Sequence, residues 1–245
     1  MKGTSRLWLR AVVVVVSVAS VSACTTTVRK HPGFEERRKE LRSVAVMPPE
    51  VEIVRVVFRG DNEELREEAE AVSQRLAELL EAELRRRGFE VKPVRLAEPE
   101  LSQDADLRFE LTQIRATFAE KSAEMFQVGR MSKSEALAYE ASLGPSVNRF
   151  ADRAGVDALC FVRMAGWKKS GGEIARDWTM TLLLGAATAG GLVRVPHAKG
   201  AGIEVALVDG TTGDVLWANA AGKYGDFEGK GLESMVEDLF EGFPK

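Results

Sequence analysis

The chain has 245 residues, of which 45% are hydrophobic and 29% charged, so it can bury a core of its own and is not disordered. Its formal charge is −3 although Lys2, Arg6 and Arg10 begin the chain with three cations, so the rest is mildly acidic, which argues against a nucleic-acid partner. The two cysteines, Cys24 and Cys160, are too few for a disulfide scaffold or a thiolate metal site.

The first residues have the charge and hydrophobicity order of a secretory signal. Residues 1–10 are basic, and Ala11–Val21 is apolar apart from a few serines. A membrane-spanning helix is the alternative, but Ser, Thr and Cys interrupt the uncharged stretch before it reaches ~20 apolar residues. We therefore predict a signal peptide over residues 1–23.

The end of this signal, Val21-Ser22-Ala23-Cys24, resembles the lipobox of bacterial lipoproteins. The resemblance implies that Cys24 is diacylated and becomes the first residue of the mature chain. We prefer this interpretation to an ordinary cleavage site followed by an incidental cysteine. Two or more acyl chains anchor a protein stably. Thr25 stands where such lipoproteins carry an aspartate when they stay at the inner membrane, so the resemblance implies the outer membrane, with the protein facing the periplasm.

The segment after the cysteine is polar and poor in apolar residues. We predict that residues 24–42 form the acylated N-terminus and a tether, with a helical turn or two around Phe34–Leu41. Fully extended, such a tether reaches at most about 60 Å.

Residues 43–245 are predicted to form one α/β domain. Ser43–Pro49 is a β-branched run closed by two prolines, which suits a buried first strand. In the helix that follows, Asp61 and Glu64 fit a capping box, and Gly88 fits the left-handed position after the last turn. The apolar positions of this helix recur at three-to-four spacing and are Leu65, Ala69, Val72, Leu76, Leu79, Leu80 and Leu84. The arginines at its end, Arg85–Arg87, are interpreted as a solvated helix end in preference to a phosphate or lipid-headgroup patch.

Further elements follow in chain order. Phe89–Val94 is predicted to be a strand. Leu107–Phe118 is predicted to be a helix, although the apolar residues in its first part also alternate as in a strand. Helices are predicted over Ser134–Leu143 and Pro145–Ala154, the second ending at Gly155. Val156–Trp167 is predicted to be a strand buried on both faces, which makes Cys160 a structural, inert thiol.

A hairpin and a helix close the domain. Asp209–Gly213 is predicted to be the turn of the hairpin, and Leu232–Phe243 is amphipathic. One face of the hairpin is predicted to hold Ile203, Val205, Leu207, Val215, Trp217 and Asn219. The sequence therefore predicts a single α/β domain, a mixed sheet with helices packed on it, preceded by a lipoprotein signal peptide.

This order of motifs is similar to that of a group of bacterial envelope lipoproteins. The motifs are the lipobox, "SVAVMPP", "RRRGFEV", "AGVDALCFVRM" and "VALVDGTTGDVLWANA". The resemblance implies the α/β fold found in CsgG, LpoB, PelC and the amino-terminal domain of TolB, whose members serve as secretion pores, export rings, synthase activators or transport accessories. The shared motifs are fold features, so no one of these functions follows from them.

An uncharged run, Trp178–Val193, departs from a plain version of that fold. It could insert into a membrane as a hairpin, but Leu182–Leu184 lacks the alternation of a barrel strand. A buried helix or an oligomer contact is the preferred interpretation.

Residues that carry chemistry are scarce. His31 and His197 belong to no catalytic or zinc motif. Gly200 and Gly202 lack the third glycine of a dinucleotide fingerprint, and Gly229-Lys230-Gly231 lacks the rest of a P-loop. We therefore predict no catalytic, cofactor-binding or metal residues, no cofactor and no enzymatic activity; Cys24 is the one predicted site, for lipidation.

These observations predict a lipid-anchored outer-membrane lipoprotein that faces the periplasm and acts as a non-catalytic binding or assembly factor of an envelope or transport complex. Its expected partners are the membrane, through the anchor, and an envelope protein or a second copy of itself, with no nucleic acid. The alternative is a homo-oligomeric ring or pore subunit for export, similar to CsgG and PelC, with Trp178–Val195 at the subunit contacts or in the membrane.

Overall fold

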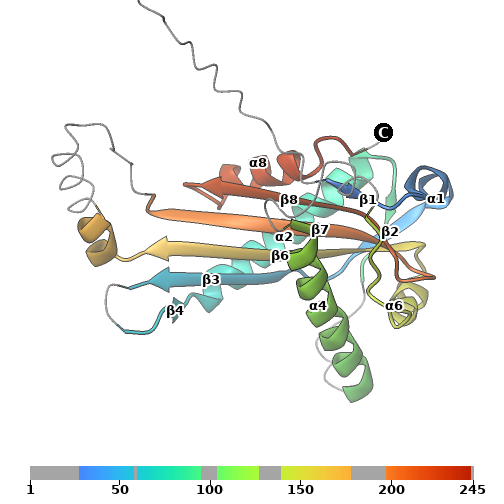
Figure 1. Ribbon diagram of the computed structural model, residues 1–245, viewed down its shortest axis with the longest axis horizontal. Helices are drawn as coiled ribbons and strands as arrows, with labels where there is room; N and C mark the ends of the chain where they lie inside the picture. The colour runs from blue at the N-terminus through green and yellow to red at the C-terminus, as the bar shows by residue number, and fades with distance from the viewer. Residues whose placement is uncertain (1–27, 58–59, 95–103, 127–138, 178–196, 244–245) are drawn as a thin grey trace, which may run out of the picture.

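The computed structural model describes residues 28–57, 60–94, 104–126, 139–177 and 197–243 (Figure 1). Cys24, the predicted signal peptide and the apolar run over residues 178–195 lie outside these ranges. The described residues form one mixed, eight-stranded sheet with helices on both faces, which confirms the predicted α/β class. Across the sheet the order is β1 (Arg29–Lys30), β8 (Val215–Tyr224), β7 (Lys199–Asp209), β6 (Ala158–Lys169), β2 (Ser43–Val46) and β5 (Glu90–Val91), with β3 (Glu50–Val56) beside β6 and β4 (Glu63–Glu64) beside β3.

Helices cover the sheet in two layers (Figure 1). One face carries α1 (Phe34–Glu40), α2 (Arg66–Arg86) and α8 (Lys230–Leu239), and the other carries α4 (Ala105–Phe126) and α6 (Val147–Ala154). A further short helix spans residues 171–177. Two apolar clusters fill the spaces between sheet and helices, one on each side, so the sheet is the middle of three layers.

Strand β6 is buried on both faces over its first half, as predicted. Cys160 lies in that half, and burial raises the pKa of its thiol to about 12, as expected for an inert thiol. Both β2 and β3 pair with β6 in parallel, whereas β7 pairs with it antiparallel.

Strands β2 and β3 are two parts of one path along β6. The predicted first strand ends before its prolines, but the chain resumes pairing directly after them in β3, which the sequence did not predict. From Val46 to Glu50 the chain advances one residue more than its partner β6 does from Cys160 to Arg163. The extra residue reverses the alternation, as in a β-bulge, so that Ile53 faces the same apolar cluster as Val46.

The long helix is confirmed, but its predicted capping box is wrong. Glu64 belongs to β4, which pairs with β3, and α2 begins at Arg66 without a side-chain cap. The predicted apolar stripe is buried at Ala69, Val72, Leu76, Leu80 and Leu84. The helix ends as expected: Gly88 has φ +86°, and the Phe89 N–H donates to the Leu84 carbonyl at 3.2 Å.

Two other predictions differ from the structure because tertiary contacts, which local sequence patterns do not contain, decide the local conformation. The helix predicted over residues 134–143 is wrong where it is described, because residues 139–143 are not helical and Ser142 forms a bridge with Asp214 of the β7–β8 turn. The hairpin is confirmed, but a bulge after Leu207 places Trp217 opposite Leu207 and turns Val215 to the other face. The helices at α4, α6 and α8 and the strand at β5 are confirmed with shifted ends.

The predicted tether is not a tether in its described part. Strand β1 pairs antiparallel with β8 at Trp217 and Ala218, and Phe34 of α1 is only 1% exposed. Val28, the first described residue, is 7% exposed and belongs to the core. Residues 28–42 therefore belong to the folded domain, and residues 24–27 alone separate it from the start predicted for the mature chain.

Asp157 explains the "AGVDA" motif that precedes β6. Its Oδ2 accepts hydrogen bonds from the N–H groups of Arg42 and Ser43, both at 2.8 Å, and from the Ser43 hydroxyl at 2.9 Å. Partial burial alone would raise the pKa of Asp157, but these hydrogen bonds, with Lys92, lower it overall. The carboxylate thus aligns the starts of the two parallel strands β2 and β6.

We predict that Asp157→Ala lowers the free energy of unfolding by about 1 kcal/mol at pH 7, since its hydrogen bonds are partly exposed to solvent. Because the folded pKa of Asp157 lies below the unfolded one, this stabilisation is present above the ordinary carboxyl pKa and is lost as the pH falls through the folded pKa. Urea denaturation at pH 7 and pH 3 measures the effect, with the exposed Asp152→Ala as control. An equal loss at both pH values would contradict the assignment.

Candidate functional site

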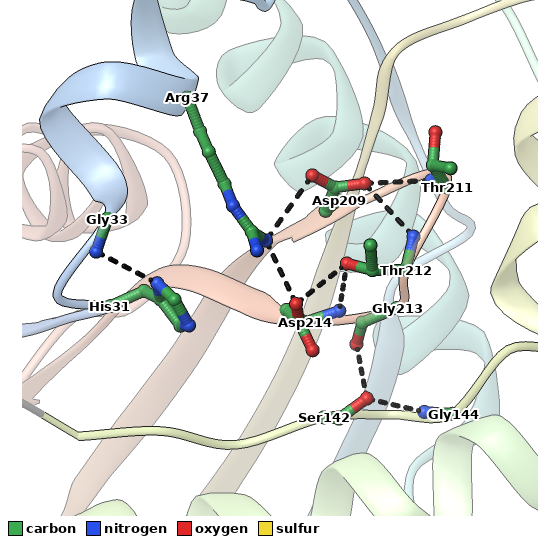
Figure 2. Close-up of polar contacts among 10 residues, drawn as sticks. All are labelled: His31, Gly33, Arg37, Ser142, Gly144, Asp209, Thr211, Thr212, Gly213 and Asp214. Atoms are coloured by element: carbon green, nitrogen blue, oxygen red, sulfur yellow. Dashed lines mark hydrogen bonds and ion pairs between the residues drawn. The ribbon is translucent and has the colours of Figure 1, made fainter.

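An N-terminal clasp holds the first described residues to the β7–β8 turn (Figure 2). Arg37 of α1 places its Nη1 2.9 Å from Asp214 Oδ2 and 3.6 Å from Asp209 Oδ2. The turn is ordered from within, because Asp209 Oδ1 accepts hydrogen bonds from the N–H groups of Thr211 and Thr212 at 2.8 and 3.1 Å. We call Arg37, Asp209, Asp214 and Phe34 the N-terminal clasp.

The clasp continues into the core. His31, one of the two histidines considered for chemistry, donates its backbone N–H to the Leu216 carbonyl at 2.9 Å and accepts a hydrogen bond from Gly33 N–H on Nδ1 at 3.0 Å. Phe34 packs edge-to-face on Phe243, with ring centroids 6.0 Å apart. His31 is therefore part of the turn that leads from β1 into α1.

The same turn is fixed from its other side. The Ser142 hydroxyl donates to the Gly213 carbonyl at 3.1 Å (Figure 2). The Leu143 N–H donates to the same carbonyl at 2.8 Å. Gly213 has φ +78°, and a Cβ there would lie 2.1 Å from the Gly144 carbonyl oxygen, so only glycine fits. Three segments far apart in sequence thus meet at one rigid turn.

At the opposite end, the sheet is longer than its helical cover. Strands β3, β6, β7 and β8 run past α4 (Figure 1), and no described helix covers this end on the α4 side. The residues that face that side include Ala165, Gly202 and Gly222, all exposed. We call these three residues the open sheet face.

Aromatic rings border the open sheet face. Tyr224 is 60% exposed, His197 stacks on it with centroids 4.2 Å apart, and Trp167 meets it at 6.4 Å. Gly200 lies opposite both Trp167 and Tyr224, and a Cβ there would approach the two rings to 3.1 and 3.2 Å. Gly200 therefore allows the two rings to pack close to the strands.

Two hollows flank the inner end of this face. One, of about 560 Å³, lies between α4 and strands β3 and β6 and includes Glu50 and Arg115. The other, of about 370 Å³, lies between the end of α4 and strands β7 and β8 and includes Phe126 and Glu204. Arg163 lines both hollows, so a cation separates them.

Arg163 and Glu204 form the polar centre of this region. They lie opposite each other in the β6–β7 register, with Arg163 Nη1 3.9 Å from Glu204 Oε2. Burial raises the pKa of Glu204, and Arg163 counteracts that rise. Such a pair can bind a polar group, but no group of three or more His, Cys, Asp or Glu side chains in the described part of the chain is placed to hold a metal ion.

The other residues singled out in the sequence have structural contacts. Gly231 lies in the first turn of α8, and a Cβ there would lie 1.9 Å from the Asp226 carbonyl oxygen. Arg85 and Arg86 pair with glutamates of their own helix, as expected of a helix end. Arg87 is 16% exposed and donates to the Phe240 carbonyl at 2.9 Å, so for this residue the interpretation as a solvated end was wrong.

Comparisons with known proteins give weak likenesses to solved structures. No protein-family model matches the chain, and no curated protein matches it by sequence. A PelC dodecamer from Paraburkholderia phytofirmans has a TM-score of 0.35 and 10% identity, covering 81% of this chain and 84% of that one. Lipoprotein GNA1162 from Neisseria meningitidis has a TM-score of 0.35 and 13% identity, covering 82% of this chain and 96% of that one. Likenesses this weak carry no statement about what the chain does.

We predict that Phe34→Ala lowers the free energy of unfolding by about 3–5 kcal/mol, because it empties a buried aromatic site under α1. Limited trypsin digestion should then cleave first within α1, after Arg37 or Arg38. Guanidinium denaturation measures the stability, and the exposed Glu36→Ala serves as control with a change below about 0.5 kcal/mol. Wild-type stability of the Phe34 variant would show that the clasp is dispensable.

We predict that Glu204→Gln raises the free energy of unfolding at pH 7.5 by up to about 1 kcal/mol. The raised pKa means that ionised Glu204 costs more in the folded than in the unfolded chain, a cost that is absent below the unfolded pKa and grows as the pH rises. The gain should therefore vanish near pH 4. Denaturation at both pH values tests this, with the exposed Glu52→Gln as control, and a loss of stability at pH 7.5 would refute it.

Proposed function

We propose that the protein is a lipid-anchored lipoprotein of the outer membrane that faces the periplasm and binds or assembles with envelope proteins without catalysing a reaction. The observation that carries the proposal is the position of Val28. Buried in the core, it follows the predicted lipidation residue Cys24 by only four positions. Cleavage at Cys24 requires the folded core to lie after that residue, and the described core begins at Val28.

The side chains of the described residues support a binding role. His31 is engaged in a turn, His197 stacks on Tyr224, and Cys160 is buried with a raised pKa, so none is poised as a nucleophile or base. No helix among the described residues is long and apolar enough to cross a membrane. The open sheet face offers an uncharged floor between two hollows lined by charged side chains of both signs, which suits a docked segment of an envelope protein.

A homo-oligomeric ring or pore subunit is the second candidate. The observation that favours it is the edge of β8, where Gly222 to Tyr224 pair with β7 alone among the described strands. A strand from a second copy could extend the sheet there. Light scattering of the protein in mild detergent separates the candidates, because a ring gives a mass of many subunits and a binding factor a mass of one.

We predict that the mature protein begins at residue 24 and that its N-terminal peptide carries a diacylglyceryl group and a further acyl chain. Mass spectrometry of protein extracted from membranes measures this directly. Cys24→Ser should abolish the modification and the sedimentation with outer membranes, whereas Cys160→Ser should leave both unchanged because Cys160 is buried. A mature chain that starts elsewhere and carries no lipid would end the proposal.

A further inference from the structure

The attachment of the domain to its lipid is short. Four Cα–Cα steps join Cys24 to Val28, and an extended chain of that length spans at most about 14 Å. Val28 cannot move outward without unfolding, because Arg29 Nε donates to the Met125 carbonyl at 2.9 Å and Lys30 pairs with Trp217. If Cys24 carries the proposed lipid, the domain is held within about 14 Å of it.

The register of β1 fixes where on the domain this attachment lies. Arg29 pairs with Ala218 in an antiparallel arrangement, so the chain enters β1 from the end at which β8 finishes, at Tyr224. Along that strand Tyr224 lies about 20 Å beyond Ala218, at 3.4 Å per residue. The lipid therefore belongs to the β8 side of the sheet.

The outer end of β8 has the chemistry of a membrane interface. We call Gly222, Tyr224 and His197 the β8 rim; it contains no acid, lysine or arginine and presents the exposed Tyr224 ring with His197 stacked on it. Tyrosine and tryptophan favour the interface of a bilayer because one end of the ring system is apolar and the other polar.

The charges of the sheet edges favour the same orientation. Strand β8 contains one lysine and no acid, and the exposed Asp226 that follows it is paired with Lys199 at 2.8 Å. The opposite edge carries one arginine, Arg55, and four glutamates on β3 and β4, namely Glu50, Glu52, Glu63 and Glu64. The exposed acids of α8 and the turn after it, Glu237, Asp238 and Glu241, lie toward the end of α8 that contacts Asn219, away from Tyr224. An anionic phospholipid surface would repel the glutamate edge and accept the β8 rim.

We infer that the β8 rim lies against the phospholipid surface, held there by the short attachment to Cys24. This inference rests on the proposed lipidation and adds the orientation of the domain and the surface that contacts lipid. The glutamate edge of β3 and β4 then points away from the membrane.

Site-specific labels test the orientation. A cysteine at Gly222 meets nothing closer than the Ala201 carbonyl oxygen at 3.7 Å, so Gly222→Cys should fold normally, and Glu64→Cys is the control on the opposite edge. A thiol-reactive fluorophore reaches these positions alone, because Cys24 carries lipid and Cys160 is buried. The labelled lipoproteins are reconstituted into vesicles of phosphatidylethanolamine and phosphatidylglycerol.

We predict that the label at 222 is quenched by doxyl-labelled lipid and is at least three-fold less accessible to aqueous iodide than the label at 64. Equal accessibility of the two labels would overturn the inference. The inference would also be overturned if the label at 222 were shielded only at high protein density and crosslinks formed between copies. In that case a second copy, and not lipid, would cover the rim. Failure of the protein to float with the vesicles would instead defeat the proposed lipidation.

A second variant tests the attachment. Twenty Gly and Ser residues inserted between Thr27 and Val28 add about 25 Å of flexible chain without altering the fold. Flotation should be unchanged, while the iodide accessibility of the label at 222 should rise at least two-fold. Unchanged shielding would overturn the claim that the short attachment holds the rim at the membrane.

Discussion

The pairing of the first described strand with β8 is the constraint on which the functional argument depends. Because Arg29 and Lys30 pair with the edge of the sheet, the chain that leads from Cys24 ends in the core rather than in a polar linker. Phe34 and Arg37 then fix the helix that follows, one by burial and one by its ion pair with the β7–β8 turn.

The open sheet face results from unequal strand lengths. Strands β6, β7 and β8 have 12, 11 and 10 residues, whereas β2 and β5 have 4 and 2, so only one end of the sheet forms complete layers with the helices on both sides. At the covered end, β2 pairs in parallel with β5 and β6. Beyond it β6 continues between β3, which is parallel to it, and β7, which is antiparallel, and one face of the sheet there is exposed to solvent. The core and the candidate binding surface therefore occupy different ends of the same strands.

The elements that the sequence predicts are those set by local chemistry. The stripe through Leu76 and the left-handed Gly88 need only helical spacing and a residue without Cβ. The failures have distant causes: a bulge turns Val215, and pairing with the β7–β8 turn keeps residues 139–143 out of a helix. The clasp gives no local signal, because a single Phe34 in a polar segment is compatible with a tether. Arg163 and Glu204 do give a local signal, because each is a lone charge within an apolar stretch of its strand. Only the pairing register of β6 and β7 shows that they lie opposite each other.

The edge of β8 links the anchor to the solubility of the fold. Unpaired strand edges favour association between copies, and proteins protect them with charge, bulges or a covering segment. Here β1 covers Trp217 and Ala218, and the one lysine of β8 beyond them, Lys223, is directed to Ser234 of α8 and not to the β8 rim. An edge with so little charge is protected if it rests among lipid headgroups, where water and polar lipid groups can satisfy its backbone. The short attachment would then both place the domain at the membrane and keep its weakest edge away from other copies.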